Sequence, residues 1–129
     1  MKKLFIISLV LLAMAGVLLL SLPTILHRAG LHPEYDGPAV ALPGKRALVI
    51  TTSHAVLAAP GETEGSPTGV FASELTHPYY TFLDGGMEVD VASIRGGEIP
   101  IDPQSFLFIM KSPEDERYLN DPIAQAKVK

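Results

Sequence analysis

The longest apolar stretch of the chain is the run of 19 uncharged residues from Leu4 to Leu22. A helix of about 20 apolar residues, rising about 1.5 Å per residue, crosses a bilayer. The pattern predicts a signal anchor or transmembrane helix over residues 1–24, with residues 4–22 in the membrane. Lys2 and Lys3 precede the run, and basic residues favour the cytoplasmic side. We therefore expect a single-pass protein with a cytoplasmic amino end and an extracytoplasmic domain.

A cleaved signal peptide is the alternative interpretation of this stretch. Ala13, Met14 and Ala15 form the small-x-small pattern that signal peptidases accept. Cleavage there would leave the apolar segment 17–22 at the new amino terminus. The apolar run continues through the candidate cut, so an uncleaved anchor is favoured.

A Pro- and Gly-rich segment follows the anchor. Residues 23–44 contain four prolines and three glycines with little periodicity, a composition typical of linkers. We interpret residues 25–44 as a tether and residues 45–129 as the folded part.

The folded part begins with the alternation of elements that builds a parallel sheet. Residues 46–52 form a continuous apolar run rich in β-branched residues, which predicts a strand buried on both faces. Residues 53–68 show no periodicity and predict an extended loop. A helix is expected over 69–83 and a second strand over 88–93, where Val89 and Val91 alternate with polar residues.

The predicted helix at 69–83 carries an acidic residue on its apolar side. On a helical wheel at about 100° per residue, Glu74 falls between Val70 and Phe71. The pattern thus predicts a carboxylate where the helix meets the sheet. Pro78 predicts a kink or break in this helix. Tyr79 and the residue after it straddle its faces, so one should pack and the other should face water.

Three dipeptides in the last third of the chain predict short helices. Each places a capping side chain directly before a proline, the arrangement favoured at a helix start: Asp102-Pro103, Ser112-Pro113 and Asp121-Pro122. Ser112 with Asp115 also resembles a capping box. The apolar run 106–110 fits a buried helix or a strand equally well.

Composition narrows the chemistry further. The 129 residues allow one domain at most and contain no cysteine, which excludes a thiolate nucleophile and Cys-based metal sites within this chain. From residue 34 onward, 14 acidic residues face seven Lys and Arg, a net charge of about −7, which disfavours nucleic acid as a partner. His54 and His77 have no partner at ligand spacing, so ordinary surface roles are favoured and neither metal nor cofactor is expected.

An ordered set of residues in the folded part resembles a known family. The set comprises Thr68-Gly69, Glu74, Pro78, Gly86, Glu88-Val89, Ser93, Gly96-Gly97, Pro100, Asp102-Pro103 and Ser105. It is similar to the amino-terminal half of the ThiJ/PfpI superfamily, the class I glutamine amidotransferase-like group, and most of all to its glyoxalase III and heat-shock chaperone branch. The resemblance covers about residues 46–129.

The resemblance implies an α/β fold and a catalytic architecture. The family fold is a flavodoxin-like doubly wound parallel sheet, of which this chain would supply the first β-α-β unit and short helices. Family members place a cysteine on a strand-to-helix elbow beside a histidine, and Glu74 matches the glutamate that contacts this cysteine. Gly96 and Gly97 would shape the loop that lines the pocket.

The resemblance also implies that this chain needs a complement. The elbow with its cysteine and histidine lies later in the family's sequence than anything present here, so we expect a truncated or split protein that is inactive alone. A missing carboxyl-terminal half or a second subunit would complete a glyoxalase III, deglycase or amidase-type enzyme acting on a small carbonyl or amide. The alternative is a non-catalytic chaperone-like or binding module at the membrane.

Overall fold

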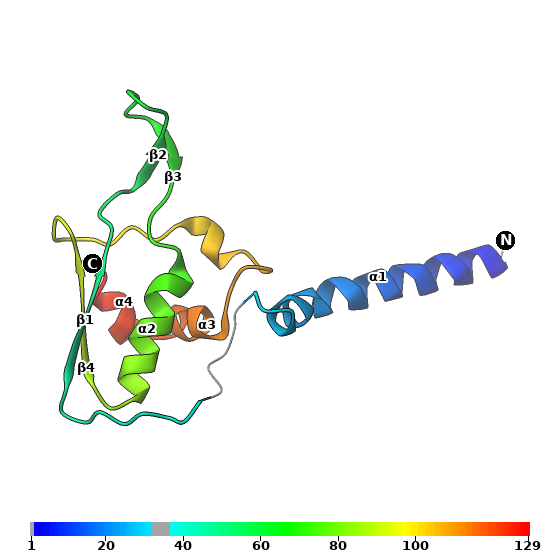
Figure 1. Cartoon of the computed structure of the whole chain (residues 1–129). Helices are drawn as coiled ribbons and strands as arrows, with labels where there is room; N and C mark the ends of the chain where they lie inside the picture. The colour runs from blue at the N-terminus through cyan, green and yellow to red at the C-terminus, as the bar shows by residue number, and fades with distance from the viewer. Residues whose placement is uncertain (1, 32–36) are drawn as a thin grey trace. The chain divides into compact units, whose positions relative to one another are not determined.

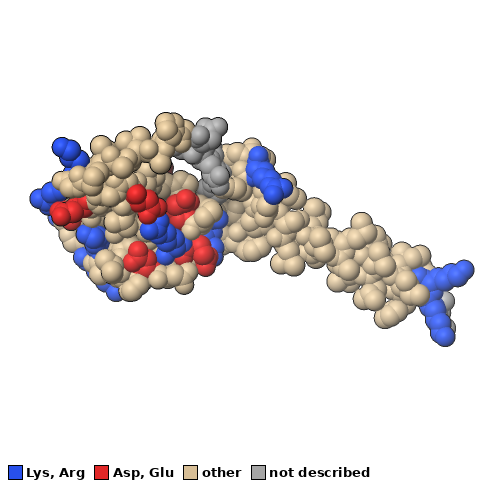
Figure 2. All heavy atoms as spheres, turned by 90° about the horizontal axis from the view of Figure 1, so that it is seen from below, with Lys and Arg blue, Asp and Glu red and all other residues tan. Residues whose placement is uncertain are grey.

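The computed structural model describes residues 2–31 and 37–129, which belong to two compact units divided between Asp36 and Gly37. The first unit contains helix α1, Lys2–Arg28, which is long and apolar enough to span a membrane. A signal sequence near the amino terminus would satisfy the same criteria. Figure 2 shows charged side chains only toward the two ends of this helix. α1 extends four residues past the predicted anchor limit at residue 24, and residues 32–36 of the predicted tether lie outside the described residues.

The second unit is a mixed α/β domain built on a parallel pair of strands. Strand β1, Arg46–Thr51, pairs with β4, Glu88–Ser93, in a register that joins Arg46 to Glu88 and Thr51 to Ser93. Helix α2, Ala72–Asp84, connects them through a crossover. The predicted strand-helix-strand order is confirmed, because continuous and alternating apolar runs specify strands locally.

Three short helices follow β4, and each starts at a predicted capping pair. They are the 3-10 helix η1 (Pro103–Phe106), α3 (Pro113–Leu119) and α4 (Pro122–Ala126). Ser112 and Asp115 form the predicted capping box at the start of α3. The ambiguous run 106–110 is neither a strand nor a long helix, since the chain turns directly after η1.

Of the kink or break predicted at Pro78, the break is wrong, because α2 runs through the proline to Asp84. Burial on both sides of the proline holds the helix together: Leu75 is 2% exposed and Tyr79 is 5% exposed. Such packing outweighs one lost backbone hydrogen bond. Tyr80 is also buried, at 1% exposure, so the expectation that one of the two tyrosines faces water is wrong as well. α2 packs on β1 and β4 and also on α3, so more than one of its faces is covered.

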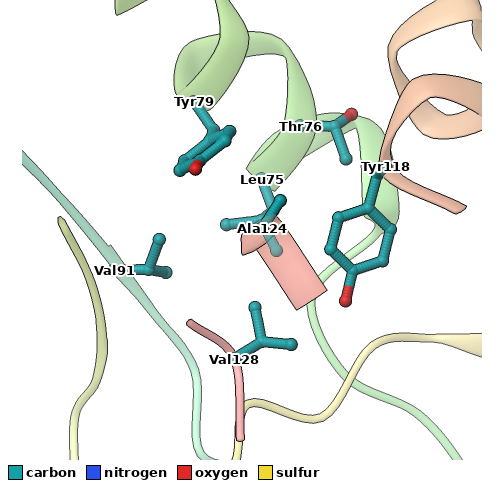
Figure 3. A pocket seen from close by; sticks show the side chains of 7 residues that line it. All are labelled: Leu75, Thr76, Tyr79, Val91, Tyr118, Ala124 and Val128. Carbon is teal, nitrogen blue, oxygen red and sulfur yellow. The ribbon is translucent and has the colours of Figure 1, made fainter. Parts of the chain in front are cut away.

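The core lies between the sheet and the helices. Figure 3 shows side chains from α2, α3, α4 and β4 converging, among them Leu75, Tyr79, Val91 and Tyr118. They enclose a void of about 10 Å³, about the volume needed to admit one water. The core is therefore closely packed and offers no room for a ligand.

The opposite face of the sheet is bare. Figure 1 shows α2, α3 and α4 on the same side of β1 and β4. Along β1, Ala47 and Val49 pack toward the core, whereas Leu48 is 57% exposed and Ile50 is 65% exposed. The prediction that this strand is buried on both faces is wrong for the described chain, because no described element covers its second face.

A small hairpin interrupts the predicted loop 53–68. Strands β2, Val56–Ala58, and β3, Gly65–Pro67, pair antiparallel, and the hairpin projects from the rest of the domain in Figure 1. A Cβ on Gly65 would lie 2.0 Å from the Leu57 carbonyl oxygen, so close pairing requires glycine there. Strands of three residues leave no alternation that a sequence pattern could reveal.

Candidate functional site

An open cleft of about 590 Å³ lies at the carboxyl end of β1 and beside the start of α2. This is where open α/β sheets commonly bind ligands, outside the carboxyl ends of parallel strands. β1, the hairpin, the entry to α2 and the turn after β4 all contribute. The lining residues are Val49, Ile50, Thr51, Thr52, His54, Leu57, Thr68, Gly69, Val70, Glu74 and Ile94.

A close backbone contact sets the entry to α2. The Val70 amide donates to the Pro100 carbonyl at 2.9 Å, and the Asp102 amide donates to the Val70 carbonyl at 2.9 Å. A Cβ on Gly69 would lie 2.1 Å from the Pro100 carbonyl oxygen. Only glycine permits this approach, which fixes where the first turn of α2 begins.

Side chains reinforce the same contact. The Thr68 hydroxyl donates to one Asp102 carboxylate oxygen at 3.1 Å, and the other oxygen accepts from the Gln104 amide at 2.8 Å. Ser105, fully buried, donates to the Asp102 carbonyl. Residues that carried the family resemblance therefore form one junction, which we call the entry clasp: Thr68, Gly69, Pro100, Asp102 and Ser105.

Glu74 lies in the first turn of α2 and lines the cleft, but its side chain is exposed. A position where the helix meets the sheet implies a buried carboxylate, and that part of the prediction is wrong for the described chain. The helical wheel placed Glu74 correctly toward the side of the sheet. The sheet stops at β1, however, and the cleft beside Glu74 is open to solvent.

Further polar groups complete the cleft: Thr51 and Thr52, which the sequence did not single out, and His54, for which it favoured an ordinary surface role. Thr51 and Thr52 end the apolar run of β1, and His54 follows them with its amide bound to the Thr52 hydroxyl at 2.9 Å. Their position at the end of a strand or just after it was the available signal, because strand ends converge at one edge of a parallel sheet. Together with Thr68 they offer hydroxyl and imidazole groups for hydrogen bonding to a ligand.

Gly96 and Gly97 are not among the residues that line this cleft. Both have φ of +74° in the turn after β4, a conformation that favours glycine. The Gly97 carbonyl lies 3.4 Å from the Ser93 hydroxyl, and Ile94 of the same turn does reach the cleft. These glycines thus shape the turn next to the site.

The cleft has an acid and hydroxyls but no thiol, since the chain contains no cysteine. Among residues 2–31 and 37–129, no group of three His, Cys, Asp or Glu side chains could hold a metal ion. The described residues thus present a carboxylate, an imidazole and hydroxyl groups to the cleft, which are groups that can form hydrogen bonds. A thiolate would have to come from another polypeptide segment.

A second polar cluster lies on the opposite side of α2 and joins it to α3. The Thr76 hydroxyl donates to Asp115 at 2.7 Å, while the other carboxylate oxygen of Asp115 accepts from the Ser112 amide at 2.9 Å. Thr76 is 1% exposed, and both Ser112 and Asp115 are fully buried. Each polar group here has a partner, so the cluster fixes the packing of two helices rather than forming an open site.

Tyr80 and Arg117 extend this helix contact toward α4. The Tyr80 hydroxyl donates to Asp121 at 3.1 Å, and the Arg117 guanidinium lies 4.0 Å from the Tyr80 ring centroid. Burial and the hydrogen bond to Asp121 raise the Tyr80 pKa well above its usual range. Arg117 also donates to both carboxylate oxygens of Asp84, at 2.7 and 2.9 Å, and lowers the Asp84 pKa. Figure 2 shows acidic and basic side chains interspersed on the visible face of this domain.

Comparison with solved structures gives a structural lead. No protein-family model and no curated protein matches the chain. The X-ray structure of Rapid Encystment Protein 24 KDa (REP24) of Francisella tularensis is similar, with a TM-score of 0.55 and 39% sequence identity. The similarity covers 66% of this chain and 35% of the REP24 chain. The matched part of this chain thus spans about a third of the length of the REP24 chain.

Proposed function

We propose that this chain is the amino-terminal part of a membrane-anchored ThiJ/PfpI-like protein with a flavodoxin-like sheet. Its complete domain would be a cysteine-dependent enzyme of the glyoxalase III, deglycase or amidase type, acting on a small carbonyl or amide. Glu74 would be the acid beside the cysteine. This chain lacks the nucleophile, so we expect no activity from it alone.

The observation that carries the proposal is the position of Glu74. It lines a cleft at the carboxyl end of β1, in the first turn of a helix whose entry is fixed by the clasp. A neighbouring segment that closed the cleft would desolvate this carboxylate. Desolvation raises the pKa of an acid and lets it share a proton with a reacting group.

The test is a Glu74→Gln variant of the full chain joined to the cysteine-bearing half of a glyoxalase III relative. We expect turnover of a small 2-oxoaldehyde to fall about 100-fold, since a positioned acid or base contributes about 10²–10⁴-fold. Glu62→Gln, in the hairpin loop outside the cleft, is the matched control and should keep full turnover. Equal turnover and equal cysteine oxidation in the Glu74→Gln variant would remove Glu74 from the mechanism.

The bare apolar face favours a second candidate function, a chaperone-like or binding module. Leu48, Ile50, Leu57 and Ile94 are each more than half exposed, and contiguous exposed apolar surface often binds partners. Suppression of aggregation of an unfolded client by the full chain in detergent would support this function. Equal suppression by a Leu48→Asp, Ile50→Asp double variant would exclude the bare face as the binding surface.

We further propose that α1 anchors the protein with its amino end in the cytoplasm. The two lysines before the apolar run support this orientation. Protease added to intact cells should then digest the domain 46–129. Protection of that segment would contradict the orientation, and a mature protein beginning near residue 16 would indicate a cleaved signal peptide instead.

A further inference from the structure

The sheet has an open edge at β1. On the side of β1 that faces β4, the carbonyl of Lys45 accepts a hydrogen bond from the Glu88 amide at 2.9 Å, and the carbonyl of Thr51 accepts one from the Ile94 amide at 3.2 Å. Peptide groups alternate in direction along a strand. The N–H and C=O groups of Arg46, Leu48 and Ile50 therefore point away from β4, toward an edge that no described strand occupies.

The bare face beside this edge is continuous with the candidate site. Leu48 and Ile50 project from it, and Ile50 also lines the cleft. Leu57, 66% exposed, and Ile94, 78% exposed, form further apolar parts of the cleft wall. Any element that covers the bare face would consequently also narrow the cleft around Glu74.

We infer that a polypeptide equivalent to the part of REP24 outside the matched third docks on this surface. It adds a strand parallel to β1 along the open edge and packs apolar side chains on Leu48 and Ile50, which closes the cleft. The identity of the occupant rests on the proposed function, whereas the edge and the face follow from the geometry of β1. The REP24 similarity, which covers 35% of that chain, leaves ample sequence for such a complement.

The physics of parallel sheets favours this occupant. Parallel strands occur almost only where both faces are covered, and an unpaired edge invites a further strand. A parallel strand would run in the same direction as β1, so its carboxyl end would lie beside Ile50 and the cleft. Its amino end would lie beside Arg46, where charged groups already gather.

A second copy of this chain fits the surface less well. Two β1 edges related by a twofold axis would run antiparallel and set Arg46 of one copy beside the apolar end of the other. A membrane also fits poorly. Arg46 and Glu88 on this face have side chains that are 73% and 80% exposed, and charges are costly in contact with hydrocarbon.

The test uses the full chain in detergent micelles, co-expressed with the REP24 polypeptide from which the matched third is deleted. We expect the two to co-purify. Residue-resolved hydrogen exchange should show the Leu48 and Ile50 amides slowed at least about 100-fold in the complex, because they gain hydrogen bonds there. The Ala47 and Val49 amides, which face β4, should be protected with or without the partner.

A matched pair of variants locates the contact. Leu48→Asp places a charge on the bare face and should reduce co-purification at least about tenfold, while the chain alone stays folded by circular dichroism. Leu119→Asp alters an exposed leucine of α3, 42% exposed, and should leave co-purification unchanged. Equal effects of the two substitutions would contradict docking on the bare face.

Other results would overturn the inference. These are failure of the two polypeptides to co-purify, and unchanged exchange at Leu48 and Ile50 within a complex. If the Leu48 and Ile50 amides of this chain alone became more protected from hydrogen exchange as its concentration rose, the edge would be assigned to a second copy. Protection by phosphatidylcholine vesicles would assign the face to the membrane. A stable complex in which Glu74→Gln does not alter turnover would contradict only the proposed function.

Discussion

The two faces of the β1–β4 sheet differ in what their side chains contact. On one face Val89, 4% exposed, packs with Leu75 and Tyr79 of α2. On the other face Leu48 and Ile50 remain more than half exposed. Both faces carry aliphatic residues suited to burial, but the bare face also carries the exposed charged residues Arg46, Glu88 and Asp90 toward one end. The faces differ further in whether the described chain supplies an element to cover their aliphatic residues.

Truncating one leucine on each side of the sheet should give the largest difference in the free energy of unfolding. Leu75→Ala, in the core, is expected to lower the free energy of unfolding by about 2–5 kcal/mol, because it removes buried contacts and leaves a cavity. Leu48→Ala, on the bare face, should change it by less than about 0.5 kcal/mol. Urea unfolding of the full chain in mild detergent, followed by tyrosine fluorescence, measures both. Similar losses would mean that the bare face is covered in solution.

A smaller effect is expected from the buried polar cluster on the covered side. Asp115→Ala leaves the Thr76 hydroxyl and the Ser112 amide without their acceptor, and should lower the free energy of unfolding by about 2–3 kcal/mol. Glu116→Ala, a neighbouring acid with a side chain that is 55% exposed, is the control and should have little effect. A neutral Asp115→Ala variant would show that α3 does not depend on this cluster for its docking.

Sequence patterns predicted the helices and strands of this domain better than the exposure and contacts of their side chains. The bounds of β4 and the caps at Asp102, Ser112 and Asp121 follow from neighbouring residues, and the structure has them as expected. Local rules specify such features because the interacting groups lie within a few residues. The mixed α/β class followed from the same rules, whereas a complete flavodoxin-like sheet remains a proposal.

The site was harder to predict because it depends on distant contacts. Periodicity placed Glu74 on the side of the sheet, but it does not reveal how far the sheet extends, so the exposure of Glu74 was missed. The burial of Tyr80 depends on Asp121 and Arg117, more than 30 residues later. The roles of Gly69 and Pro100 in the entry clasp became explicable only when their contact was known.

Tyr80 allows a pH test of the covered side. Its pKa is raised in the fold by burial and by Asp121, so the stabilisation is complete below the unfolded value of about 10 and is lost as pH rises above it. Tyr80→Phe should lower the free energy of unfolding by about 1 kcal/mol at pH 7, through one lost hydrogen bond. The variant should also show a shallower decline in the free energy of unfolding above pH 10, by about 1 kcal/mol per pH unit.

The control for this test lies on the bare face. Leu48→Ala should leave the alkaline decline unchanged, because no tyrosine contacts that side chain among the described packing residues. Tyr79 and Tyr118 have raised pKa values too, so the Tyr80→Phe variant should retain part of the decline. A decline as steep as that of the unaltered chain would show that Tyr80 does not titrate on unfolding.

The smallest effect is expected for the charges of the bare face. Asp90 lies 2.9 Å from the Arg46 guanidinium and 3.4 Å from the Lys127 ammonium, and these partners lower its pKa. Exposed ion pairs of this kind contribute little and are screened by salt. Asp90→Asn should therefore leave the thermal midpoint of the full chain unchanged within error at 0.15 M salt. If the docked strand covers the bare face, the same substitution in the complex removes a partner from a desolvated Arg46, and the midpoint should fall measurably. Equal midpoints in both settings would mean that the charged end of this face stays in water even when its apolar end is occupied.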